Sequence, residues 1–192
     1  MTVKLEGNWA KGFAYDVHTL GSVYQGLDEF GHKRYDTTRT EMGGLVYKLK
    51  YRNDKSVTKE IVDLLSKYKG IGKFDAIIPA PSSNKSRSYQ PADEIALELG
   101  KRMGVNVLIG FLEKKEDSKE LKNITDPEER IQELKKAIFI SSERNISGQK
   151  VLLLDDLYRS GATLSVSTDI LYKQAKVSDV SVLTMTKTKS NR

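Results

Sequence analysis

The most restrictive feature of the sequence is the run from Val151 to Leu164. Its first four residues are apolar, and an unbroken apolar run bounded by turn residues is typical of a strand buried on both faces of a parallel sheet. Asp155 and Asp156 follow at once. Because ligands of such sheets bind beyond the carboxyl ends of the strands, we expect these two carboxylates to face a ligand.

The turn that follows the acid pair is rich in groups that bind anions. Its residues are Arg159, Ser160, Gly161, Ala162 and Thr163, and a helical pattern begins at about Ala162. Backbone N–H groups at a helix N-terminus bind phosphate. The strand end therefore combines hydroxyl-seeking carboxylates with a phosphate cradle, which a phosphorylated sugar requires. The alternative is a buried strand whose acid pair only caps a helix or a turn.

The same stretch resembles the motif that binds phosphoribosyl pyrophosphate (PRPP) in type I phosphoribosyltransferases. That motif has four apolar residues, two acids and a loop that ends in Thr/Ser-Gly-x-Thr. The resemblance implies that Asp155 and Asp156 are the catalytic pair and hydrogen-bond the ribose hydroxyls. It implies that the loop 159–163 holds the 5-phosphate. It also implies Mg²⁺ as the cofactor, carried by the pyrophosphate of PRPP and not by protein ligands.

The rest of the chain follows an α/β pattern. Strand patterns at 74–79, 105–109, 137–140 and 178–186 alternate with helical patterns from about residues 40, 57, 91, 126 and 162. We expect a doubly wound, mainly parallel sheet with helices on both faces. Residues 1–72 form a β-rich and helical N-terminal addition, in which Phe13–His18 pairs with Ser22–Gln25. Residues 73–192 form the core of the type I phosphoribosyltransferase fold.

The order of the parts is similar to that of the ComF-like (competence protein F-like) branch of this family. This resemblance implies that the loop from Ala80 to Lys85 is the pyrophosphate loop, with residues Ala80, Pro81, Ser82, Ser83, Asn84 and Lys85. It also implies that residues 113–135 are a mobile hood over the site. Lys85 and Arg87 are candidates for neutralising pyrophosphate. The charges of Lys114, Lys115 and Lys119 are expected to be solvated, since acidic residues are interspersed with them.

The chain departs from family patterns at informative positions. It has no cysteine, so it lacks both the zinc ribbon of some ComF-like proteins and the Cys nucleophile of glutamine-dependent enzymes. The 6-oxopurine enzymes place a carboxylate where this chain has Arg159. Because arginine stays protonated near neutral pH, it cannot accept a proton from the base, which argues against hypoxanthine or guanine as the acceptor.

The composition excludes several kinds of site and targeting segment. The absence of cysteine excludes disulfides and fits a reducing cytoplasm, which is the expected location. Two histidines make a histidine-based metal site improbable, and no apolar run approaches the length of a membrane span. The N-terminus lacks the apolar segment of a signal peptide. A net charge of +6 favours anionic ligands only modestly.

We therefore expect an enzyme that transfers a 5-phosphoribosyl group from Mg-PRPP to a small nitrogen acceptor and releases pyrophosphate. A homodimer is a plausible assembly. The alternative is a non-catalytic PRPP sensor or a single-stranded-DNA-binding accessory protein of DNA uptake. Residues 33–52 hold the basic and aromatic groups for such binding: Lys33, Arg34, Arg39, Lys48, Lys50, Arg52, Tyr35, Tyr47 and Tyr51. The competing interpretation is that these tyrosines pack under the sheet and the charges are solvated.

Overall fold

A computed structural model describes residues 2–68, 70–82, 87–115 and 124–189. Six strands form the central sheet in the order β1-β2-β10-β9-β5-β6. Their bounds are β1 Val3–Lys4, β2 Lys11–Val17, β10 Asp179–Lys187, β9 Lys150–Tyr158, β5 Ala76–Pro79 and β6 Asn106–Val107. Only β1 pairs antiparallel. The mainly parallel α/β sheet that the sequence predicts is therefore confirmed.

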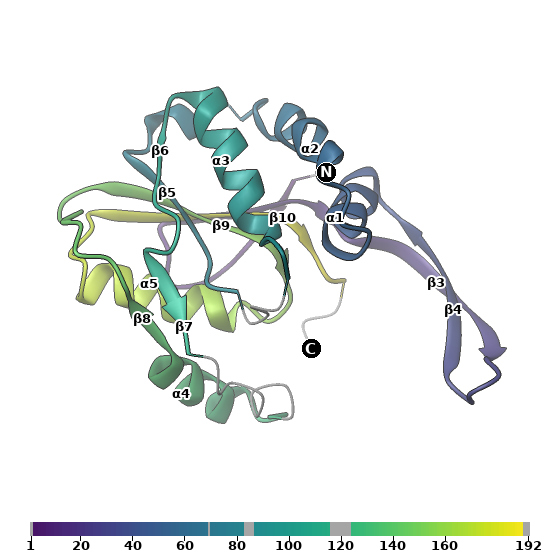
Figure 1. Cartoon of the computed structure of the whole chain (residues 1–192). Helices are drawn as coiled ribbons and strands as arrows, with labels where there is room; N and C mark the ends of the chain where they lie inside the picture. Colours follow the sequence, from purple (N-terminus) through teal and green to yellow (C-terminus); the bar gives the residue numbers. More distant parts are fainter. Residues whose placement is uncertain (1, 69, 83–86, 116–123, 190–192) are drawn as a thin grey trace.

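Helices cover both faces of this sheet (Figure 1). One face carries α1 (Glu41–Tyr51), α2 (Thr58–Leu65) and α3 (Pro91–Met103), and the other carries α4 (Pro127–Ala137) and α5 (Ala162–Lys173). Single turns of 3₁₀-helix stand at Lys55–Val57 and Ile71–Lys73. None of the helices in the described part of the chain is long and apolar enough to cross a membrane.

Alternation along the central strands divides the core into two hydrophobic clusters. In β9, Leu152 and Leu154 pack toward α1, α2 and α3, whereas Leu153 packs toward α5. The last strand alternates in the same way, because Val180 and Val182 lie in one cluster and Leu183 and Met185 in the other. Neighbouring residues of one strand thus face different helices, and this property sets the geometry of the site described below.

The N-terminal strands pair differently from the sequence-based expectation. β2 pairs in parallel with β10, and β3 (Thr19–Leu27) pairs with β4 (Lys33–Arg39), so the expected pairing of β2 with β3 is wrong. The Asp28 carboxylate accepts the N–H groups of Phe30 and His32 and closes the hairpin there. The first 72 residues supply two strands of the central sheet, β1 and β2, so this sheet is built from residues on both sides of the expected boundary at residue 72.

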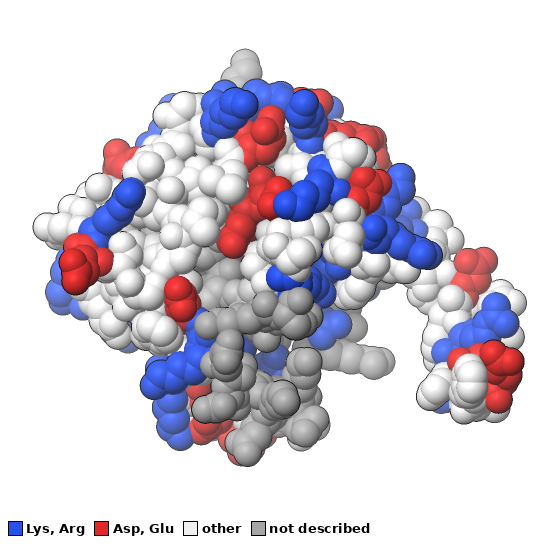
Figure 2. Space-filling view, viewed as in Figure 1, with Lys and Arg blue, Asp and Glu red and all other residues white. Residues whose placement is uncertain are grey.

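The β3–β4 hairpin, residues 19–39, projects from the body and is called the arm below (Figure 1). Acidic and basic side chains lie close together on it (Figure 2). At its base, α1 passes so close to the chain that a Cβ at Gly43 would lie 2.0 Å from the carbonyl oxygen of His18. Close packing against the chain therefore requires a glycine at position 43 of this helix.

A second small sheet lies beside the central one. β7 (Leu112–Lys114) pairs antiparallel with β8 (Ile138–Ile140), and α4 connects back to β8. Helix α4 starts where the sequence predicts, with the Asp126 carboxylate accepting the N–H groups of Glu128 and Glu129 and Pro127 in the first turn. The expected hood, 113–135, includes parts of β7 and α4, and its residues 116–123 lie outside the described residues.

Candidate functional site

The acid pair lies inside β9, past the point where one neighbouring strand stops. β9 pairs with β5 as far as Leu154 but continues beside β10 to Tyr158. The sequence placed Asp155 and Asp156 at the strand end, and the structure differs because the long partner β10 extends the pairing. The carboxylates still open onto the edge of the sheet, since β5 ends before them.

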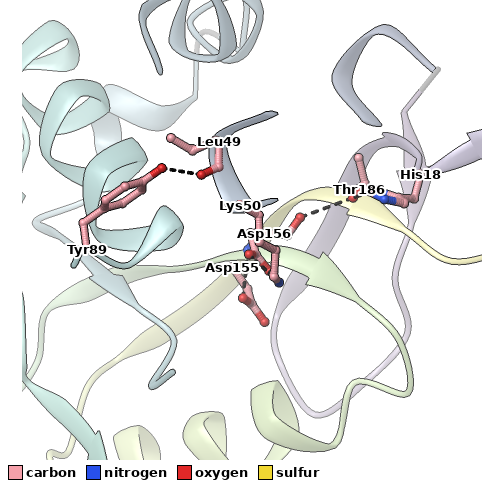
Figure 3. A network of polar contacts seen from close by, with 7 residues as sticks. All are labelled: His18, Leu49, Lys50, Tyr89, Asp155, Asp156 and Thr186. Atoms are coloured by element: carbon pink, nitrogen blue, oxygen red, sulfur yellow. Dashed lines mark hydrogen bonds and ion pairs between the residues drawn. The ribbon is translucent and has the colours of Figure 1, made fainter. Parts of the chain in front are cut away.

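Asp156 faces α1 and forms an ion pair there. Both of its carboxylate oxygens accept hydrogen bonds from Nζ of Lys50, at 2.9 and 2.7 Å, and the side chains are only 11% and 18% exposed (Figure 3). The hydroxyl of Thr186 donates to the Asp156 carbonyl oxygen at 3.3 Å. On the other side of Thr186, Nδ1 of His18 lies 3.0 Å from the hydroxyl oxygen. Asp156 is therefore fixed from α1, β10 and the base of the arm.

Asp155 points to the opposite side of β9, because alternate side chains of a strand face opposite ways (Figure 3). Its Oδ1 accepts the N–H of Asp156 at 2.8 Å. Burial raises the pKa of Asp155 to about 7, and the negative charge of Asp156 adds to this increase. The positive charge of Lys50 lowers the same pKa, but by less. The two acids are thus unequal: Asp156 has a cationic partner, whereas Asp155 changes its charge near neutral pH.

The loop 159–163 closes around a small cavity of about 110 Å³ at the N-terminus of α5. Residues 157–164 line it together with Asp155 and Arg130. Gly161 caps the helix with a φ of 75°, and a Cβ there would lie 2.7 Å from the ring of Tyr158. Both the backbone conformation and the close approach require glycine at this position. The predicted phosphate loop thus encloses a cavity at the N-terminus of α5, a position where backbone N–H groups commonly bind anions in proteins.

A larger cavity of about 370 Å³ joins the predicted parts of the site. Its lining includes the acid pair, Arg159 and Thr163 from the loop after β9, and Ala80, Pro81 and Ser82 from the loop after β5. Ser160, Gly161 and Ala162 line only the smaller cavity. Ser83, Asn84 and Lys85 lie outside the described residues. The described part of the predicted pyrophosphate loop thus shares one cavity with the acid pair.

Several further residues of this cavity were not assigned to the donor site from the sequence, among them Lys50, Gln90 and Arg130. Lys50 directly follows Leu49, a fully buried residue of α1. Its position at the edge of the buried face of this helix was the one sign in the sequence that Lys50 could contact the sheet. Arg130 follows Pro127 by three residues, which places it one turn into α4. The resemblance placed the segment that contains Arg130 over the site, as part of the expected hood 113–135, but gave Arg130 no role of its own. No pattern in the sequence indicated that Lys50 would meet β9 in particular, because only the fold brings α1 to this strand.

A neighbouring cavity of about 350 Å³ lies across the loop after β5. Its lining includes Asp93, Glu113 and Lys114, and it shares Ala80–Ser82 and Gln90 with the larger cavity. Lys114 is only 4% exposed, so the expectation of a solvated charge is wrong at this position. Burial, followed by the charge of Arg130, lowers the pKa of Lys114 to about 8. Burial also raises the pKa of Asp93.

The residues of the site suit Mg²⁺ only in combination with a ligand. Asp155 places a carboxylate beside the predicted phosphate loop. Among the described residues, no three His, Asp or Glu side chains gather in a way that could hold a metal ion. One carboxylate plus ligand phosphates is an arrangement that Mg²⁺ commonly uses. The residues therefore fit a metal that arrives with a polyphosphate ligand.

No protein-family model matches the sequence, and no curated protein matches it. Solved structures share its fold. An adenine phosphoribosyltransferase superposes with a TM-score of 0.51 at 11% identity and covers 89% of this chain and 87% of its own. The adenine phosphoribosyltransferase of Saccharomyces cerevisiae, in complex with an imino-altritol bisphosphate and adenine, gives 0.51 at 10% identity, covering 88% and 85%. The chain therefore has the type I phosphoribosyltransferase fold.

Proposed function

We propose that the protein binds PRPP with Mg²⁺ and transfers the 5-phosphoribosyl group to a nitrogen acceptor, with release of pyrophosphate. The observation that carries the proposal is the cavity in which the acid pair, part of the phosphate loop and the start of the loop after β5 meet. The phosphoribosyltransferases among the solved structures with this fold support the same class of reaction.

Each part of the cavity has a chemical role in this proposal. The loop 159–163 holds the 5-phosphate through backbone N–H groups and hydroxyls at the start of α5. Asp155, when ionised, accepts hydrogen bonds from the ribose hydroxyls, and Lys50 keeps Asp156 in place behind it. Arg87 and Arg130 supply positive charge to the same cavity. The loop 80–85 binds the pyrophosphate.

The reaction develops positive charge on the ribose as the bond between C1 and pyrophosphate breaks. Fixed carboxylates beside the ribose stabilise that charge, and they do so more strongly in a site from which water is excluded. Mg²⁺, when bound, neutralises negative charge on the departing pyrophosphate. Residues 113–135 serve as the hood that excludes water. The acceptor occupies the cavity next to the loop after β5, where Asp93, Glu113 and Lys114 offer polar groups.

The finer assignments belong to the same proposal. A ComF-like relationship rests on the order of the motifs along the chain and on the run Leu49-Lys50-Tyr51-Arg52, whose Lys50 meets Asp156. A cytoplasmic location rests on the absence of cysteine. Arg159, which lines both donor cavities, makes hypoxanthine and guanine unsuitable acceptors because it cannot accept a proton.

The experiment that tests the proposal measures pyrophosphate release from Mg-PRPP in the presence of a panel of nucleobases and amines. We expect the wild-type protein to release pyrophosphate with at least one nitrogen acceptor, but not with hypoxanthine or guanine. The variant Asp155→Asn/Asp156→Asn should release no pyrophosphate with any acceptor. Binding of PRPP with no release for any acceptor would contradict the enzyme and favour the PRPP sensor.

A further inference from the structure

The arm is a two-stranded hairpin with many exposed apolar side chains. Six of its large apolar or aromatic side chains are 52–76% exposed: Leu20, Val23, Tyr24, Leu27, Phe30 and Tyr35. None of them belongs to either hydrophobic cluster of the body. Figure 1 shows the arm extending away from the sheet and its helices. Because an isolated two-stranded hairpin is marginally stable in water, the arm requires a partner.

The charges of the arm indicate what kind of partner fits. Its acidic residues are Asp28, Glu29 and Asp36, and its basic residues are Lys33, Arg34 and Arg39. The six charges sum to zero, and acidic and basic side chains lie close together on the arm (Figure 2). A nucleic-acid surface needs clustered positive charge. A balanced pattern instead suits a protein surface with the same alternation, and a second copy of this chain provides one.

Both outer edges of the arm are open in the described part of the chain, but β3 carries no charged side chain, so only β4 offers charges that select a pairing register. β3 and β4 form a sheet of their own, and within the part of the chain that the structure describes no strand pairs with the outer edge of β4. The Leu20 carbonyl oxygen, at the base of β3, accepts a hydrogen bond from Nζ of Lys189. An open strand edge is a template for pairing with another strand.

We propose that two copies of the chain pair through β4, antiparallel about a two-fold axis at Tyr35. In a two-fold antiparallel pair the axis passes beside one residue, which then lies opposite its own copy. An axis at Arg34 sets two arginines against each other, and an axis at Asp36 sets two aspartates against each other. An axis at Tyr35 sets Arg34 opposite the partner's Asp36, twice. Opposite charges across strands stabilise and like charges destabilise, so charge selects Tyr35.

The pairing explains the arm as part of a larger sheet. Two arms joined at β4 form four strands, which is enough for a stable sheet. Tyr24 and Tyr35 already face each other across the arm, with ring centroids 5.6 Å apart. The partner's Tyr35 extends this contact into an aromatic ladder across all four strands. The same patch meets itself, as a closed two-fold dimer requires.

Charge reversal and its rescue test the register. Sedimentation velocity up to roughly 100 μM, which detects micromolar dimers, should show a dimer of the wild-type chain. Arg34→Asp and Asp36→Arg should each weaken dimerisation at least about tenfold, because each creates two like-charge pairs. The double variant should restore the dimer. Lys33→Glu, whose residue lies opposite the partner's Thr37, should leave it unchanged.

A cysteine cross-link tests the same register independently, because the chain has no cysteine of its own. Tyr35→Cys places two thiols directly opposite each other and should form a disulfide-linked dimer on mild oxidation. Thr37→Cys places them four positions apart along the paired strands and should stay monomeric on a non-reducing gel. A monomeric wild type at every concentration, single reversals without effect, or cross-linking of Thr37→Cys alone would overturn the proposal.

Discussion

Two neighbouring aspartates of β9 have different surroundings, because successive side chains of a strand face opposite ways. Asp156 meets Lys50 across the α1 face, and Asp155 lies on the other face, where burial raises its pKa to about 7. Such a difference between adjacent carboxylates is typical of sites where charge is used in binding or catalysis. The site thus combines Asp156, which Lys50 holds in an ion pair, with Asp155, whose carboxyl group has a pKa of about 7.

The raised pKa of Asp155 predicts how stability changes with pH. The unfolded chain releases this proton near the ordinary value of 3.8, whereas the folded protein keeps it to about 7. The free energy of unfolding therefore falls as pH rises through this window. Asp155→Asn removes the effect, so the variant should gain roughly 1–3 kcal/mol relative to wild type between pH 5 and pH 9. Urea unfolding at both pH values measures this gain, and equal differences at the two values would contradict it.

Removal of Lys50 leaves the Asp156 carboxylate without its cation in a largely buried position. Lys50→Met should lower the free energy of unfolding by roughly 2–4 kcal/mol, since breaking one partner of a buried pair is costly. Lys48→Met, an exposed lysine of the same helix, should change it by less than about 0.5 kcal/mol. A double-mutant cycle with Asp156→Asn isolates the pair, and a coupling near zero would show that Lys50 acts elsewhere.

At the scale of single elements, the loop before α5 depends on one glycine. Gly161 has a φ of 75° and lies against the Tyr158 ring, whereas Gly148 has a φ of 77° with nothing within 4 Å of its Cβ position. Gly148→Ala should lose only the backbone term of about 1–2 kcal/mol. Gly161→Ala should lower the free energy of unfolding by more than Gly148→Ala does, and it should also weaken PRPP binding. Thermal unfolding and a PRPP titration of both variants test this, and equal losses would contradict the close packing.

Local patterns in the sequence were sufficient to predict most of the helices and strands. The apolar run before Asp155 predicted a central strand, and Asp126-Pro127 predicted the start of α4. Strand pairing was not predictable in the same way. The alternation in β2 is equally compatible with β3 or β10 as a neighbour, and long-range packing decides between them. The ion pair of Lys50 and Asp156 joins residues 106 positions apart, so no local pattern contains it.

On the scale of the whole molecule, the sheet gathers distant segments at one edge. The loop after β5, the end of α1, the start of α4 and the loop after β9 line one cavity although they span residues 50–163. The arm leaves the body from the end of β2, away from both hydrophobic clusters. Its hairpin turn was predictable from Asp28 and its neighbours, but its projection from the body was not, since nothing local in the sequence distinguishes an arm from a covered hairpin.

The central claim is that this edge of the sheet binds Mg-PRPP, and a thermal-shift titration tests it most directly. At about 100 times its dissociation constant a ligand adds about 2.7 kcal/mol of stability, which raises the melting temperature of a chain of this size by several degrees. We predict that shift for wild type and for Lys48→Met with PRPP and Mg²⁺, and its loss in Asp155→Asn/Asp156→Asn. No shift in the wild type, or an equal shift in the double variant, would contradict the account.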